Sequence, residues 1–382
     1  MTCFYLSMIS IRKNMNFSYW EHEIWLKNID FAIIGGGIVG LSAAYHIQLE
    51  HPDAHVVVFE RDFVSLGAST RNAGFACFGS PSEILSDLKN QPAHQVFSTM
   101  AMRWRGLQLL RSYISDEEMD FYQHDGFEIL LQENNDLSNE VEGTLNQLNE
   151  QAAEFLAFKP YTYTTNDWGF QGVQSVVRIK GEGILHPGKM IQAWQKKCSA
   201  IGVEFRFGLN IDALDVIGPA LIIKEENVPV KNIVICTNGF ARQLLPDLDV
   251  IPARNQVLVT NEILEKPWDQ SFHFREGYVY LRSVGKRVLI GGGRDLFEKE
   301  ESTDVIAHND ENQDYLKNFL GKLLNKNDIK FDYRWSGIMG MGKSKGPIIQ
   351  KISDGVYVGV RMGGMGVAIG TWVGKELSHL TK

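Results

Sequence analysis

Three glycines in the first part of the chain have the spacing of a nucleotide-binding turn. Gly35, Gly37 and Gly40 form the pattern Gly-x-Gly-x-x-Gly, which permits a tight turn and brings backbone N–H groups close to a pyrophosphate. Glu60 stands twenty residues after Gly40, where a carboxylate typically accepts hydrogen bonds from the adenosine ribose. The cofactor contacts expected from this turn are Gly35, Gly37, Ile38, Val39 and Gly40.

The elements around these residues favour a ligand over an empty turn. An apolar run over 29–34 ends at Gly35, and residues 41–50 have apolar positions at helical spacing. A second apolar run over 55–60 ends in Glu60. Strand, glycine turn, helix and strand within about 30 residues form the βαβ unit in which this pattern binds dinucleotides.

The segment after Glu60 has side chains suited to phosphates. It reads Gly67-Ala68-Ser69-Thr70-Arg71-Asn72-Ala73-Gly74, in which small residues and hydroxyls permit close approach and an arginine can neutralise a pyrophosphate. This segment resembles the flavin-wrapping segment of the D-amino-acid oxidase superfamily, particularly the glycine oxidase, sarcosine oxidase and γ-glutamylputrescine oxidase branch. The resemblance extends from about Trp20 to the C-terminus. It implies FAD contacts at Arg61, Ala68, Ser69, Thr70, Arg71, Asn72, Ala73 and Gly74.

Later motifs are similar to other cofactor-contacting parts of that superfamily. The segment GVEFRFGLNI resembles the strand that reaches the adenine, NIVICTNG the strand and turn that close over the cofactor, and VGVRMGGMGVAIG the loop and helix start beside the flavin ring. A helix N-terminus there would stabilise negative charge on the reduced flavin. The contacts that the resemblance implies are Ile211, Thr237, Asn238, Gly239, Gly337, Arg361, Gly363, Gly364, Met365, Gly366 and Val367.

The resemblance also implies that FAD is bound without a covalent link. Arg71 occupies the place where one branch of the superfamily has an attaching histidine. Another branch uses a C-terminal cysteine, and this chain has no cysteine after Cys236. Cys77 lies near the wrapping segment and is interpreted as a small buried residue.

The family's substrate-binding arginine is replaced. The motif resembling Trp-x-Gly-Leu-Arg-Pro reads Trp335-Ser336-Gly337-Ile338-Met339, and a thioether cannot form bidentate bonds to a carboxylate. Arg282 and Arg361 are candidate substitutes, with a solvated strand position and a structural ion pair as their alternatives. Lys343 is a weaker candidate, with a surface loop as its alternative. Tyr280 is expected to line the cavity. The predicted catalytic-site residues are therefore Tyr280, Arg282, Arg361 and Met339.

Four methionines are expected near the face of the flavin ring. They form either an apolar pocket for the substrate or part of the hydrophobic core. They are Met339, Met341, Met362 and Met365.

The resemblance implies an FAD-dependent amine or amino-acid oxidase or dehydrogenase. A hydride would pass from a C–H next to an amine to flavin N5, with oxygen or another acceptor reoxidising the flavin. Two alternatives stay open: an FAD-dependent 2-hydroxy-acid dehydrogenase, and a flavin-binding protein with little turnover. A tRNA-tail amine is less favoured because no basic RNA-binding surface stands out.

Composition and charge limit the partners. The 382 residues carry 38 basic and 46 acidic side chains, and the resulting net charge of −8 with no polybasic run disfavours nucleic acid. The four cysteines lack metal-site spacing, so no metal is expected. No apolar run approaches the ~20 residues needed to cross a bilayer. A small-molecule substrate and a cytoplasmic location are expected.

The expected fold is an α/β FAD-binding Rossmann-like domain interleaved with an α+β substrate domain that contains a mostly antiparallel sheet. The predicted FAD-binding domain is discontinuous, over 25–100, 172–252 and 333–382, and the substrate domain covers 101–171 and 253–332. Residues 1–24 are expected to be an N-terminal extension, with the fold beginning near Met15 to Trp20.

Overall fold

The computed structural model describes residues 17–382. Most of the expected N-terminal extension, including Met15, lies outside the described residues. The described chain begins with α1 (Tyr19–Glu21) and the short helix η1 (His22–Leu26), which end at the buried Leu26.

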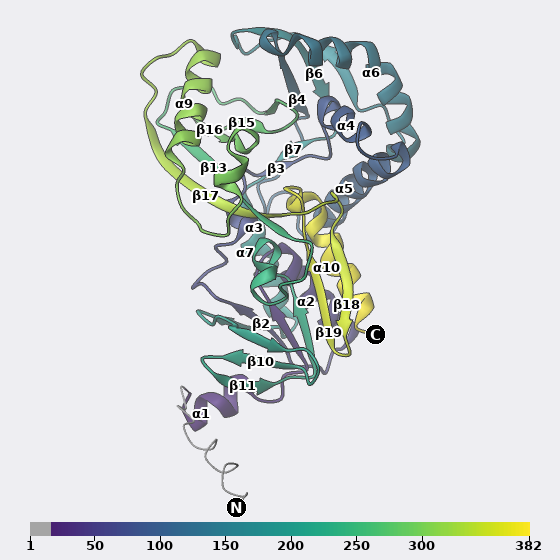
Figure 1. The fold of residues 1–382 in the computed structure, drawn as a ribbon, viewed down its shortest axis with the longest axis vertical. Coiled ribbons are helices and arrows are strands. Elements are labelled where there is room, and N and C mark those ends of the chain that lie inside the picture. Colours follow the sequence, from purple (N-terminus) through teal and green to yellow (C-terminus); the bar gives the residue numbers. More distant parts are fainter. Residues whose placement is uncertain (1–16) are drawn as a thin grey trace, which may run out of the picture.

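A six-stranded sheet in the lower part of the molecule carries the nucleotide-binding turn (Figure 1). Its order is β18 (Ile348–Ser353), β19 (Val356–Val360), β12 (Asn232–Ile235), β1 (Phe31–Ile34), β2 (Val56–Glu60) and β8 (Glu204–Phe207). All neighbours pair in parallel except β18 and β19. Every residue of β1, β2 and β19 is buried, as expected for strands covered on both faces.

Helices cover one face of this sheet, and a small sheet covers the other. The helices α2 (Ile38–Glu50), α7 (Pro187–Ala200), α10 (Gly366–Leu380) and part of α5 (Ala93–Tyr113) share one apolar core with β1 and β2. The opposite core includes side chains from β9 (Ala213–Asp215), β10 (Ala220–Ile223) and β11 (Glu226–Pro229). The sheet that carries the turn between β1 and α2 is therefore packed against an apolar core on each face.

The upper part of the molecule is built on an eight-stranded sheet (Figure 1). Its order is β17 (Phe331–Met341), β13 (Ile251–Thr260), β16 (Arg287–Gly292), β15 (Val279–Val284), β14 (Ser271–Phe274), β4 (Gly126–Leu131), β6 (Val173–Ile179) and β5 (Tyr161–Thr164). Only the β14–β4 pairing is parallel. The helix α9 (Asp310–Leu324) packs on one face of this sheet, and α4 (Pro81–Leu88), α5 and α6 (Asn135–Leu156) pack on the opposite face against β4 and β6.

Short elements lie where the two parts meet. They are α3 (Ala68–Arg71), the paired strands β3 (Phe75–Ala76) and β7 (Gly183–Ile184), and η3 (Asn238–Gln243). The remaining short helices, η2 (Gln132–Asn134), η4 (Arg294–Leu296) and α8 (Glu298–Glu301), lie in connections of the upper part.

The expected fold class is confirmed, with two differences in detail. The strand expected from the segment GVEFRFGLNI is limited to β8, because Gly208 turns the chain with φ +73°. The strands β6 and β17 fall within segments assigned to the FAD-binding domain, yet they pair in the eight-stranded sheet. The domain division itself stays a prediction.

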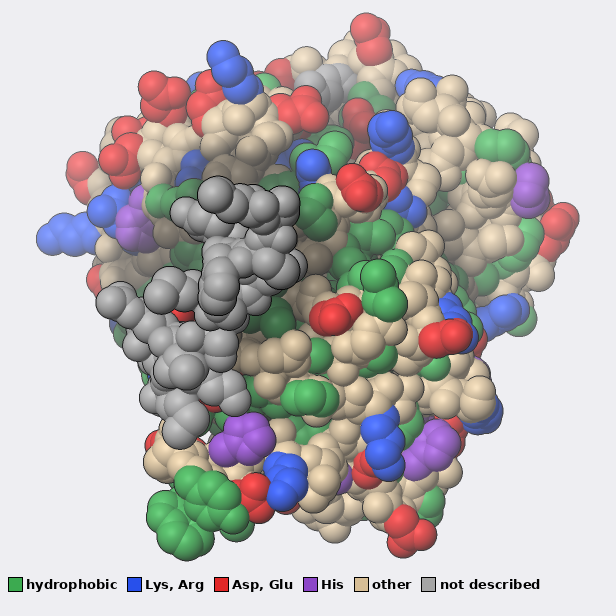
Figure 2. All heavy atoms as spheres, turned by 60° about the horizontal axis from the view of Figure 1, so that its bottom comes forward, with side chains coloured by type: hydrophobic (Ala, Val, Ile, Leu, Met, Phe, Trp, Pro, Cys, Tyr) green, Lys and Arg blue, Asp and Glu red, His purple; other side chains and the backbone are tan. Residues whose placement is uncertain are grey.

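Charged side chains of both signs are present on the visible face of the molecule. On the face seen in Figure 2, acidic and basic side chains are interspersed, and no continuous basic patch appears there. Over residues 17–382, none of the helices combines the length and the apolar character that a membrane span requires. The cytoplasmic location stays a prediction.

The close packing of α10 against α2 can be tested with matched glycine substitutions. A Cβ at Gly374 in α10 would lie 2.5 Å from the carbonyl oxygen of Val39, so we expect Gly374→Ala to lower the free energy of unfolding by about 1–3 kcal/mol. A Cβ at Gly143 in α6 would meet only open space, so Gly143→Ala should raise this free energy by up to about 1 kcal/mol. Urea unfolding of both variants checks this. If both substitutions change the free energy of unfolding equally, the close packing of α10 against α2 is contradicted.

Candidate active site

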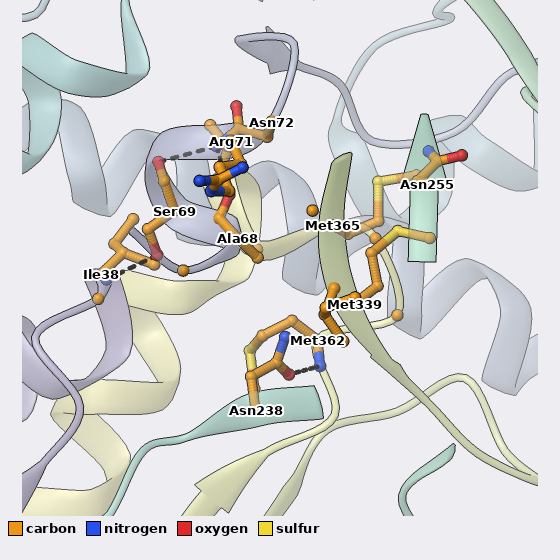
Figure 3. Close-up of a pocket in the computed structure, with 18 of the residues that line it drawn as sticks. Ile38, Ala68, Ser69, Arg71, Asn72, Asn238, Asn255, Met339, Met362 and Met365 are labelled. Carbon is orange, nitrogen blue, oxygen red and sulfur yellow. Dashed lines mark hydrogen bonds between the residues drawn. The ribbon is translucent and has the colours of Figure 1, made fainter. Parts of the chain in front are cut away.

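One cavity of about 390 Å³ runs from the β1–α2 turn to the eight-stranded sheet. Figure 3 shows Ile38, Ala68 and Ser69 on one side and Met339, Met365 and Asn255 on the other. Its walls therefore come from both parts of the molecule, at the place where α3 and β3 connect them.

The β1–α2 turn is built for the close approach of a ligand to the backbone. Gly35 has φ +107°, and a Cβ at Gly40 would lie 2.0 Å from the Gly35 carbonyl oxygen. Gly35, Gly37, Ile38 and Val39 line the cavity, whereas Gly40 lies behind them and lets α2 pack against β1. The first turn of α2 thus presents backbone N–H groups to the cavity, as anion binding at a helix N-terminus requires.

Glu60 lies at the end of β2, beside this turn, and lines the cavity. Its Oε2 accepts a hydrogen bond of 2.9 Å from Gly36 N, and its Oε1 accepts one of 3.2 Å from Asp62 N. Burial raises the pKa of Glu60 even though these N–H groups lower it. Each carboxylate oxygen keeps further acceptor capacity for a hydroxyl donor in the cavity.

The wrapping segment folds over the turn. Ser69 Oγ accepts a 3.0 Å bond from Ile38 N (Figure 3), and Arg71 donates to the carbonyls of Leu66 and Ser336 at 2.8 and 2.9 Å. The segment's residues that line the cavity are Gly67, Ala68, Ser69, Arg71, Asn72 and Ala73.

Two residues expected to contact the cofactor from this segment face elsewhere. Thr70 Oγ1 donates to the carbonyl of Ser65 at 2.6 Å, and Thr70 does not line the cavity. Gly74 is also outside the lining and serves packing, because a Cβ there would lie 2.2 Å from the Leu185 carbonyl oxygen. Arg61 does line the cavity, with its guanidinium carbon 3.9 Å from the ring centroid of Phe240.

The β1–α2 turn and the wrapping segment form one wall of the cavity, called here the nucleotide-facing wall. The loop before α10, which includes Gly363 and Gly364, forms the other end of this wall. Asn238 Oδ1 accepts a bond of 3.2 Å from Met362 N (Figure 3). The same oxygen accepts one of 3.1 Å from Arg361 N. Gly239 does not line the cavity; a Cβ there would lie 2.6 Å from the Met339 carbonyl oxygen. The expected contacts that do line it are Ile211, Thr237, Asn238, Gly337, Gly363, Gly364, Met365, Gly366 and Val367.

Two cavity-lining polar atoms lack partners in the described part of the chain. Thr237 Oγ1 and Asn255 Oδ1 are buried and form no hydrogen bond with residues 17–382. A buried polar atom without a partner costs about 1–3 kcal/mol. Together with the glycine turn, the helix N-terminus and Glu60, these atoms fit a long ligand that carries phosphates, hydroxyls and a polar ring.

Arg282 and Arg361 do not serve as the expected substrate anchors, and neither lines the cavity. Arg282 donates to the carbonyls of Gly74 and Leu185 at 3.1 and 3.0 Å, and burial lowers its pKa to about 10. Arg361 lies 2.5 Å from the Asp249 carboxylate, so the structural ion pair is the correct interpretation. The prediction that one of them binds substrate was wrong. The groups that Arg282 and Arg361 contact lie far away in the chain, and the sequence does not reveal such pairings.

Other predicted substrate-side residues do reach the cavity. Tyr280 lines it, accepts a 3.0 Å bond from Asn255 Nδ2, and packs its ring 5.3 Å from that of Phe75. Burial raises the pKa of Tyr280, so its hydroxyl is neutral at ordinary pH. Lys343 does not line the cavity. All four methionines do, namely Met339, Met341, Met362 and Met365.

A buried ion pair in the wall escaped the sequence analysis. His273 Nε2 lies 2.8 Å from Glu182 Oε2, and both side chains are buried and line the cavity. The two residues are 91 positions apart, and neither stands in a recognisable motif. Glu276 and Arg294, which also line the cavity, were missed for the same reason.

The His273–Glu182 pair predicts a pH dependence of stability. Burial alone would lower the pKa of His273, but Glu182, Glu128 and Glu83 outweigh burial and raise it above 6.5. A histidine whose pKa rises on folding stabilises the fold below its ordinary pKa and loses this as pH rises through the folded-state pKa. We therefore expect His273→Asn to reduce the free energy of unfolding more at about pH 6 than at about pH 9.

Urea unfolding of both proteins across this range, at one saturating FAD concentration, measures the difference. Glu182→Gln should weaken the same pH dependence from the other side of the pair. A difference between wild type and His273→Asn that does not vary with pH would show that the pair is not charged.

Known proteins share this architecture. A probable oxidoreductase OrdL of Rhizobium meliloti is 23% identical over 378 residues, covering 93% of this chain and 83% of the relative. The L-proline dehydrogenase of P. horikoshii superposes with a TM-score of 0.70 at 16% identity, covering 92% of this chain and 93% of that one. The L-α-glycerophosphate oxidase of Mycoplasma pneumoniae, solved with FAD bound, gives 0.71 at 15% identity, covering 92% and 94%.

The family assignment rests on more than shape. The model of the FAD dependent oxidoreductase family, DAO, matches residues 30–380, which include the β1–α2 turn, the wrapping segment and the loop before α10. The FAD cofactor expected from the sequence is thereby confirmed. The chain belongs to the DAO family of FAD-dependent oxidoreductases.

Proposed function

We propose that this oxidoreductase removes a hydride from a C–H bond next to an amine in a small molecule, an amine or an amino acid. The carrying observation is the carboxylate of Glu276, which lines the cavity and forms no hydrogen bond or ion pair within residues 17–382. Two other lining carboxylates, Glu83 and Glu182, are paired with Arg103 and His273. Carboxylates accept hydrogen bonds from amine N–H groups and attract an ammonium, whereas they repel a phosphate.

In this proposal FAD is held without a covalent bond along the nucleotide-facing wall. The backbone N–H groups at the start of α2 and Ser69 would hold the pyrophosphate, Glu60 would accept from the ribose hydroxyls, and Ile211 would contact the adenine. Thr237 and the loop before α10 would hold the flavin part. When bound, FAD supplies the hydride acceptor. The thiols of Cys77 and Cys236 both line the cavity, and burial raises the pKa of each, which disfavours the nucleophilic thiolate.

The substrate would bind on the side of the cavity that the eight-stranded sheet forms. Tyr280 and Asn255, joined by a hydrogen bond, orient it, and the methionine side chains exclude water from its apolar part. Among the similar structures, L-proline dehydrogenase is named for an amine substrate and supports this interpretation. L-α-glycerophosphate oxidase is named for a substrate with a hydroxyl and a phosphate and represents the competing class.

Anaerobic titration of the purified holoenzyme tests the proposal. Donors from four classes would be added separately: amino acids, N-methyl amino acids, polyamines and 2-hydroxy acids, with glycerol 3-phosphate as a phosphate-bearing control. We expect bleaching of the flavin absorbance band by a nitrogen-bearing donor and not by the others. Readmission of air then separates an oxidase, whose band returns at once, from a dehydrogenase.

Two outcomes would contradict the proposal. Bleaching by 2-hydroxy acids or glycerol 3-phosphate alone would assign the enzyme to C–OH oxidation. Bound flavin that none of the donors reduces, although dithionite does, would support a flavin-binding protein with little turnover.

Acid precipitation tests separately whether FAD is bound without a covalent bond. Flavin that stays with the precipitated protein would show a covalent bond and contradict this part of the proposal.

A further inference from the structure

Two opposite charges line the cavity from one short stretch of the eight-stranded sheet. Glu276 lies in the turn between β14 and β15, and Arg294 begins η4 directly after β16. Their two segments are joined because Gly293 N donates a 2.8 Å bond to the Tyr278 carbonyl. The Arg294 guanidinium carbon then lies 5.7 Å from the Tyr278 ring centroid.

Their neighbours are paired, whereas these two side chains are not. Arg275 donates to Asp295 at 2.5 Å and to the Tyr315 hydroxyl at 2.9 Å, which fixes the β14–β15 turn to η4. Within residues 17–382, the side chains of Glu276 and Arg294 form no hydrogen bond or ion pair, although both line the cavity. Two opposite charges that face one cavity without neutralising each other are available to a ligand that carries both signs.

Strand register places Arg294 near the site of the missing family arginine. Gly292, the last residue of β16, pairs with Gln256 of β13, and Met339 of β17 pairs with Ala253 on the other side of β13. Arg294 and Met339 therefore flank the same end of β13. A guanidinium that approaches from β16 can bind a carboxylate that the thioether of Met339 cannot.

We propose that Arg294 and Glu276 form the specificity site for an amino acid, in which Arg294 binds the substrate carboxylate and Glu276 accepts N–H from its amine. This inference rests on the proposed amine oxidation and narrows its substrate class to molecules that carry both groups. Arg294 is a planar donor matched to a carboxylate. Glu276, half-buried in the cavity wall, supplies the complementary acceptor.

Ligand-induced changes in the Tm of the holoenzyme, measured without oxygen so that bound substrate reduces the flavin at most once, test the site by a readout other than catalytic rate. The probes are D- and L-leucine, 4-methylpentanoate, which lacks the amine, and isopentylamine, which lacks the carboxylate. We expect a leucine enantiomer to raise the Tm of the wild type more than either partial analogue. Arg294→Met should abolish the response to 4-methylpentanoate and spare that to isopentylamine, and Glu276→Gln should do the reverse.

Kinetics with the best amino-acid donor from the anaerobic titration add a second measurement. Arg294→Met should raise KM about tenfold or more, as expected for loss of a charge-assisted hydrogen bond, with a smaller change in kcat. Lys286→Met is the matched control, because Lys286 lies exposed at the other end of the β15–β16 hairpin and outside the cavity lining. It should leave both KM and Tm responses unchanged.

The failures of the two proposals are distinguishable. If amine donors reduce the flavin but Arg294→Met and Glu276→Gln behave as wild type, the assigned site is wrong and amine oxidation stands. A wild type that prefers isopentylamine to both leucine enantiomers would also overturn it. If no nitrogen-bearing donor reduces the flavin, the proposed function itself fails.

Discussion

The close contact between α2 and the end of β1 is the constraint on which the rest of the site depends. A Cβ at Gly40 would lie 2.0 Å from the Gly35 carbonyl oxygen, so only glycine lets the helix begin this close to the strand. The helix N-terminus then lies at the cavity wall. Gly374 brings α10 similarly close to α2, and α10 carries the loop at Gly363 and Gly364 to the same cavity. Close glycine contacts on α2 therefore position both ends of the nucleotide-facing wall.

The second constraint is the link between the two parts of the molecule. The wrapping segment and β17 are joined by two reciprocal hydrogen bonds. Arg71 donates to the Ser336 carbonyl at 2.9 Å, and Trp335 Nε1 donates to the Arg71 carbonyl at 2.9 Å. The β17 strand continues through Gly337 and Met339 along the cavity. The sheet that carries the substrate-side residues is thereby oriented relative to the cofactor-side turn, as the proposed hydride transfer requires.

Local motifs were predictable, and long-range pairing was not. The glycine turn, Glu60 and Tyr280 could be placed because their backbone spacing and strand alternation are local properties. Arg361 was misjudged because its partner, Asp249, lies 112 residues earlier in the chain. His273 and Glu182 form a pair that only the β14–β4 region of the folded sheet brings together. Arg294 stands out only once the structure shows that Asp295 is already occupied by Arg275.

The central claim is that this cavity holds a whole FAD molecule, with its ADP part at the β1–α2 turn. The most direct test is titration of the flavin-free protein with FAD and with FMN, followed by quenching of flavin fluorescence. Because FMN lacks the adenosine that would meet Glu60 and Ile211, FAD should bind at least about a hundredfold more tightly, which corresponds to about 2.7 kcal/mol. Equal affinity for the two flavins, or no binding of either, would contradict the account.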